Sequence, residues 1–302
     1  MLKLEARPQP SNAMSFASPL VALLVTVLIG IVMFALLGKD PLRALQMFFW
    51  EPIRSAYAWT EIAVKATPLV LIGLGLSICY RSNVWNIGAE GQYVVGAIFA
   101  SGIAMQAGAD TPRAIVLAIL LAGIVGGMVW AGIVALLRDR FNANEILVSL
   151  MLVYVALMVL SYLVYGPWKD PKGYNFPQTI TFAAATKVPR LIEGFRLNIG
   201  VLIALAAVAL AWLFMFRTYR GFALQVGGLA PAAARYAGFS SRRALWIALL
   251  ISGGLAGLAG ALEATGPLGS SRPTYRRATA SRPSSSPTSA DCIRWAWSSP
   301  AS

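Results

Sequence analysis

The chain has 302 residues, of which 58% are hydrophobic and only 12% are charged. A soluble domain carries about 25% charged residues, so this composition excludes an ordinary water-soluble protein and indicates a membrane protein. The cations behind its net charge of +13 lie between apolar runs, which favours lipid headgroups over nucleic acid as partners, and the absence of histidine excludes histidine bases and histidine metal sites.

Seven apolar stretches approach or exceed the roughly 20 residues that a membrane-spanning helix needs. Backbone groups in lipid must be hydrogen-bonded internally, so these stretches predict helices rather than open strands. In chain order they are Leu20–Leu37, Ala66–Tyr80, Val84–Ala107, Ala114–Leu137, Ile146–Gly166, Leu197–Phe216 and Ala244–Leu262. We therefore expect an all-α, polytopic transmembrane bundle with about seven spans.

The amino-terminal residues 1–19 precede a long apolar run without a clean cleavage site, so we interpret that run as a retained span rather than a signal peptide. Residues 1–19 are then a cytoplasmic segment, and 20–268 form the transmembrane domain. Alternating the spans places the amino terminus, Arg81, Arg138–Arg140 and Arg217–Arg243 on one side. Each side then holds ten Lys and Arg before the tail, so the positive-inside rule does not decide the orientation. We place the tight turn Arg138–Arg140 in the cytoplasm because its charges lie at a span end.

The third stretch begins with a polar segment that contains Asn86, Glu90 and Gln92. An ionisable side chain at membrane depth is costly unless it lines a cavity or has a partner, and the glycines beside Glu90 permit an irregular backbone. One interpretation is the polar lining of a solute path in a broken span. The alternative is a short loop before a helix that starts near Ile87, where Glu90 would favour the positive helix end.

Small residues recur four apart in the fourth and seventh stretches, as Gly123 and Gly127 and as Gly253 and Gly257. This spacing lets helices approach closely in lipid, so it predicts tight helix–helix packing.

Two connections carry further signals. Asn142 or Asn144 can cap the fifth span. The proline-containing loop Pro167–Arg196 predicts an extracytoplasmic cap.

The segment Arg217–Arg243 is too long for a tight turn and too apolar for a solvated loop. Pro231 suits the first turn of a helix, and Gly238 can end one in the left-handed conformation. We expect a short helix over Ala232–Tyr236 that lies across the membrane face. It either docks into a groove on another protein or is an ordinary interfacial helix.

Three ordered segments resemble the permeases of ATP-binding-cassette importers for simple sugars and nucleosides, which are more distantly related to branched-chain amino-acid permeases. The matching segments, within residues 60–268, are Asn86–Gln92 (Asn-Ile-Gly-Ala-Glu-Gly-Gln), Asn144–Leu152, and Gly221–Gly238 followed by Ser252–Leu262. The chain departs from the family at Val153, where relatives often have Asn.

The carboxyl-terminal residues 269–302 also depart from the family, because relatives continue with apolar spans. Residues 270–302 contain ten Ser, five Arg and four Pro, which predicts disorder. Our hypothesis is that this tail is out of frame and the permease truncated. Translation of the other two reading frames tests it.

The resemblance implies a transport subunit of the bacterial inner membrane rather than an enzyme, with no catalytic or metal-binding residue. ATP and Mg would be bound by a partner ATPase that drives alternating access, beside a second permease and an extracytoplasmic solute-binding protein. The solute would be a nucleoside or a simple sugar, of which the resemblance favours the nucleoside. The implied sites are a substrate path at Asn86, Glu90 and Gln92 and an ATPase-coupling helix with Ala233, Arg235, Tyr236 and Gly238.

Other classes of protein fit the residues less well. The chain has no Gly-x-x-x-x-Gly-Lys-Ser/Thr phosphate loop, so ATP-driven transport requires another subunit. An ion-driven secondary transporter would need paired intramembrane acids or cations, and only Glu90 qualifies. A membrane enzyme would need an acid, a base and a nucleophile at one interface, and no such group stands out.

Overall fold

A computed structural model describes residues 12–108, 111–171, 179–180, 182–191 and 194–268. The predicted tail and most of the predicted cytoplasmic segment lie outside these residues. The described elements are α1 (Asn12–Leu36), α2 (Pro41–Leu45), η1 (Gln46–Trp50), α3 (Glu51–Arg54), α4 (Ala56–Arg81), α5 (Ala89–Gln106), α6 (Ile115–Phe141), α7 (Glu145–Tyr165), η2 (Ala184–Thr186), α8 (Gly200–Arg217), α9 (Tyr219–Leu229), α10 (Pro231–Tyr236), α11 (Ser241–Glu263) and η3 (Ala264–Leu268).

Six of the described helices are long and apolar enough to cross a membrane: α1, α4, α6, α7, α8 and α11. This confirms the predicted polytopic, all-α bundle. The predicted third span corresponds to α5, which begins at Ala89 rather than Val84 and is not among the six, because polar residues lower its hydropathy. The predicted start of α4 at Ala66 is too late, since the helix continues through Glu61 and Lys65.

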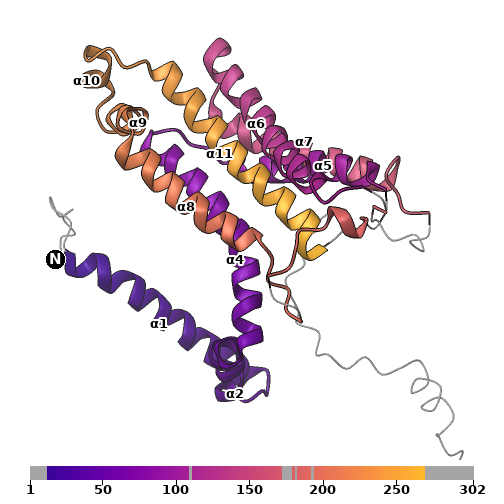
Figure 1. Cartoon of the computed structure of the whole chain (residues 1–302). Helices are drawn as coiled ribbons and strands as arrows, with labels where there is room; N and C mark the ends of the chain where they lie inside the picture. Colours follow the sequence, from indigo (N-terminus) through magenta and orange to yellow (C-terminus); the bar gives the residue numbers. More distant parts are fainter. Residues whose placement is uncertain (1–11, 109–110, 172–178, 181, 192–193, 269–302) are drawn as a thin grey trace, which may run out of the picture.

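The centre of the bundle is α11, which packs against α4, α5 and α6 (Figure 1). A side chain at Gly127 would meet the backbone of Gly253, and one at Gly257 would meet the backbone of Gly123. Gly96 of α5 likewise approaches the backbone of Gly257. The close packing predicted from the small residues is therefore present, and it allows three helices to meet backbone to backbone.

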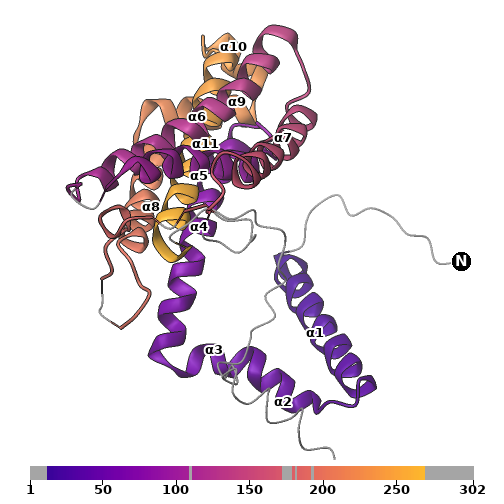
Figure 2. The same ribbon diagram turned by 90° about the vertical axis from the view of Figure 1, so that its right-hand side faces the viewer.

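The helix α1 stands away from the bundle and is joined to α4 through α2 and α3 (Figure 2). None of the residues in its apolar stretch Ala17–Leu36 is buried. In a membrane, lipid or another chain must therefore cover its sides.

One end of the bundle gathers connections that are distant in sequence. Gly228 of α9 packs against the backbone of Arg81 at the end of α4. At the start of α11, Arg242 forms an ion pair with Asp139 of α6 at 2.6 Å. We call this end, with α9 and α10, the α10 face. The connections that meet here, after α4, after α6 and between α8 and α11, are those that the alternation of spans places on one side.

Candidate functional site

The predicted break in the membrane helices lies directly after α4. Asn83 adopts a left-handed conformation with φ 54°, which Asn tolerates better than most residues. Its backbone N–H donates to Tyr80 O at 3.1 Å, and the N–H of Val84 donates to Cys79 O at 3.0 Å. These two bonds form a Schellman motif, which ends the helix and redirects the chain.

The chain then runs without helical structure until Gly88, the N-cap residue of α5. Burial alternates along this stretch: Val84 and Asn86 are buried, whereas Trp85 and Ile87 are exposed. Such a period of two is typical of an extended chain that packs on one side. The side chain of Asn86 therefore points into the bundle.

Asn86 lies in a buried cluster of three polar side chains, which we call the Asn86 cluster. Its amide nitrogen donates to Gln92 Oε1 of α5 at 3.0 Å and to Ser252 Oγ of α11 at 2.9 Å. Its amide oxygen accepts from Gln92 Nε2 at 3.1 Å and from the N–H of Gly88 at 3.2 Å. All three side chains are at most 1% exposed.

The structure thus brings two of the three predicted substrate-path residues together and separates the third. Glu90 is exposed in the first turn of α5, where its negative charge interacts favourably with the positive end of the helix dipole. Ser252 was not among the predicted residues. It lies 166 positions from Asn86, and only the resemblance of its segment to the family pointed to it.

The short helix predicted over Ala232–Tyr236 is present as α10, with Pro231 in its first turn. Gly238 has φ 81°, and its N–H donates to Arg235 O at 3.0 Å. The N–H of Phe239 donates to Ala234 O at 2.9 Å. This is again a Schellman motif, and glycine is the residue that adopts its left-handed position at least cost.

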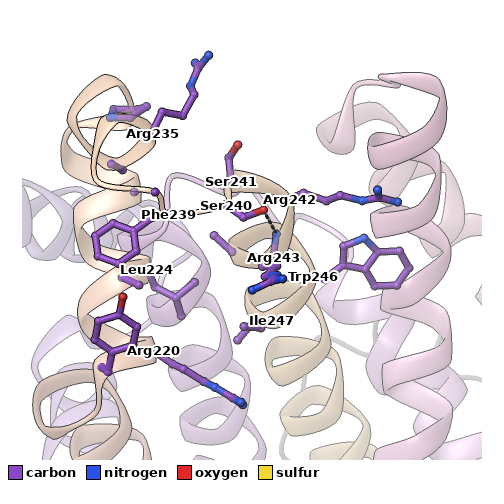
Figure 3. A pocket seen from close by; sticks show the side chains of 17 residues that line it. Arg220, Leu224, Arg235, Phe239, Ser240, Ser241, Arg242, Arg243, Trp246 and Ile247 are labelled. Atoms are coloured by element: carbon purple, nitrogen blue, oxygen red, sulfur yellow. Dashed lines mark hydrogen bonds between the residues drawn. The ribbon is translucent and has the colours of Figure 1, made fainter.

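The predicted coupling residues share the outer surface of α10. Tyr236 is 98% exposed, whereas Ala234 on the inner side is only 4% exposed. Figure 3 shows Arg235 pointing away from the rest of the α10 face. The exposed members of this surface are Ala233, Arg235, Tyr236 and Gly238.

Sequence reasoning missed α9, which precedes α10. The Thr218 hydroxyl accepts from the N–H of Gly221 at 3.1 Å and so caps the start of the helix. A side chain at Gly221 would meet the backbone of Met215, and Gly228 meets Arg81 as described above. The cap was a usable signal, but glycines weaken a helix prediction, and here they serve close packing.

At α7, Asn144 accepts from the N–H of Ile146 at 2.9 Å, which confirms the predicted cap.

A cavity of about 830 Å³ opens between the α9–α10 hairpin and the start of α11 (Figure 3). Arginine residues line it together with Leu224, Phe239 and Ile247. Asp139 Oδ2 accepts from Arg242 Nε at 2.6 Å and from Trp246 Nε1 at 3.1 Å, which joins α11 to α6 beside the cavity. Among the described residues, no group of three or more Cys, Asp and Glu side chains could hold a metal ion.

A polytopic bundle of apolar helices, with a break between α4 and α5 and an exposed short helix at one end, indicates a multi-pass membrane protein. The chain belongs to the family of branched-chain amino acid transport system permease components, whose family model matches residues 58–274, well over half of the chain. No solved structure matches this chain.

Individual relatives are permeases of ATP-binding-cassette transporters. The glucose ABC transporter permease protein of Haloferax volcanii is 34% identical over 91% of this chain and 74% of its own length. The guanosine ABC transporter permease protein of Bacillus subtilis is 29% identical over 82% and 71%, and the nucleoside ABC transporter permease protein of Lactococcus lactis is 27% identical over 82% and 70%. A second permease from each organism matches 65%, 67% and 68% of this chain.

Proposed function

We propose that this chain is the membrane-spanning permease subunit of an importer that moves a nucleoside or simple sugar across the bacterial inner membrane, driven by a separate ATPase. The observation that carries the proposal is the exposed outer surface of α10. Its inner side packs on the end of the bundle, but its outer side has no partner within the described residues. The ATPase would dock on this surface. The names of the relatives support the class of solute.

The contacts suggest how a movement of α10 would reach the solute path. α10 leads through the Gly238 turn into α11, and Ser252 lies eleven residues along α11 from Ser241, about 16 Å at 1.5 Å per residue. Ser252 holds Asn86 by a hydrogen bond, so a shift of α11 would act on the break before α5. Alternating access requires such a displacement of helices around a solute site.

We further propose that the second permease is a different chain rather than another copy of this one. Each of three organisms has two matching permeases, and one of them covers more of this chain than the other does. This pattern fits a transporter with two specialised halves. An extracytoplasmic binding protein would deliver the solute to the side opposite the α10 face.

Uptake by proteoliposomes tests the proposed function. Vesicles holding this chain, the second permease and the ATPase should take up labelled guanosine or glucose only with ATP, and vanadate should block uptake. Uptake that follows an imposed ion gradient without ATP would instead establish the ion-driven transporter.

A further inference from the structure

The cavity on the α10 face contains positive charge without a counterion. Arg220 of α9 and Arg243 of α11 line it, and neither forms an ion pair with any carboxylate of the described residues. In Figure 3 the Arg220 side chain extends from α9 toward α11, and Arg243 lies on the facing helix. Arg242 differs, because it is paired with Asp139.

The same cavity has an apolar wall. Leu224 and Ile247 line it together with the ring of Phe239. Its volume of about 830 Å³ is far larger than an inorganic anion needs, since one water occupies about 30 Å³. A fitting ligand therefore combines an anionic group with a substantial apolar body.

The position of the cavity relative to the spans indicates where such a ligand comes from. The membrane-spanning helix α8 ends at Arg217, directly before α9. At this same end, Arg81 lies over the ring of Phe216 at 5.0 Å, and Arg217 lies over the ring of Trp212 at 5.7 Å. Aromatic and cationic side chains gather at the membrane–water interface. The cavity therefore lies near the depth of lipid headgroups.

We propose that this cavity binds an anionic phospholipid, with Arg220 and Arg243 holding its phosphate and Leu224 and Ile247 contacting its acyl chains. Basic pockets between membrane helices bind anionic headgroups, and guanidinium groups offer paired donors to phosphate oxygens. The bound lipid connects α9 to α11, the two helices that flank α10. This site lies outside the proposed solute path, and it borders the docking surface of α10, because Arg235 and Gly238 also line the cavity.

Native mass spectrometry of the purified full chain, titrated with phosphatidylglycerol or phosphatidylcholine, tests this site. The wild type should retain phosphatidylglycerol about tenfold more strongly, and the double variant Arg220→Gln, Arg243→Gln should lose about that factor. The matched control is Arg43→Gln, Arg113→Gln, which removes two exposed arginines outside the cavity and should keep the preference. Lysine at positions 220 and 243 should restore most of the binding, which separates a charge effect from misfolding.

Three results would overturn the proposal. The first is undiminished phosphatidylglycerol binding by the glutamine variant, and the second is an equal loss in the control. The third is displacement of the lipid by equimolar glycerol phosphate, which would indicate a site for soluble anions. If the glutamine variant keeps its lipid but no longer copurifies with the co-expressed ATPase in a separate experiment, the cavity is a protein-docking site instead. No ATPase is present in the lipid assay, so its outcome does not depend on the proposed function.

Discussion

At the scale of single residues, the Asn86 cluster shows how a polar group is accommodated inside an apolar bundle. A buried amide is costly unless its donors and acceptors have partners. Asn86 finds them on Gln92, Ser252 and the backbone of Gly88, which belong to three separate parts of the chain. The cluster therefore ties the broken segment to α5 and α11.

Asn86 and Glu90 should respond differently to substitution. Asn86→Ala leaves Gln92 buried without its partners and should lower the free energy of unfolding by about 1–3 kcal/mol. Glu90→Gln, at an exposed position, should change it by less than about 0.5 kcal/mol. Thermal unfolding in detergent measures both effects.

The same pair of variants separates stability from transport. If Glu90 lies on the solute path, Glu90→Gln should reduce uptake although the protein is stable. Normal uptake by this variant would remove Glu90 from the proposed path, and equal destabilisation by both variants would contradict the Asn86 cluster.

The residue types of this site were predictable, but their grouping was not. Unusual polarity in an apolar stretch pointed to Asn86, Glu90 and Gln92 together. Which of them faces inward depends on where the extended segment ends and α5 begins, because side chains alternate in an extended chain but follow a period of 3.6 in a helix. The partner Ser252 comes from a distant helix, so no local pattern could supply it.

At the scale of helices, α11 depends on glycine for its central position. Gly257 allows α6 to approach so closely that any side chain there would meet the backbone of Gly123. Helix pairs in lipid gain little from hydrophobic burial, so this close contact carries much of their association.

Two alanine substitutions test this packing. Gly257→Ala should destabilise the bundle by about 1–3 kcal/mol through overpacking. Gly73→Ala on α4, where nothing lies within 4 Å, should be neutral or stabilise by up to about 1 kcal/mol. Unfolding followed by tryptophan fluorescence compares them, and identical unfolding temperatures would refute the packing argument.

Long helices were predicted from hydropathy, whereas their ends and the short helices were predicted less well. α4 extends beyond its apolar run because Glu61 interrupts hydropathy but not helical structure, and Arg196 pairs with it at 3.3 Å. α10 was predicted because proline and glycine mark both of its ends. α9 was missed because its three glycines lower helix propensity, although Thr218 was available as its N-cap.

At the scale of the whole molecule, the fold concentrates its connections at the α10 face. The ends of α4 and α6 meet α9 and α11 there through Gly228 and the Arg242–Asp139 pair. A partner that displaced α10 would therefore act on several helices at once. The sequence predicted this shared face from the alternation of spans, but charge alone did not orient it in the membrane.

Docking of the ATPase on α10 can be measured directly by photocrosslinking. A photoreactive amino acid at Tyr236 should crosslink the full chain to its co-expressed ATPase. The matched control is Tyr162 on α7, a tyrosine that is 71% exposed and distant from the α10 face. Crosslinking at Tyr236 and not at Tyr162, lost when Arg235→Ala is added, is the predicted result. Absence of any crosslink at Tyr236, while the ATPase still copurifies with the chain, would contradict the proposal that α10 is the docking surface.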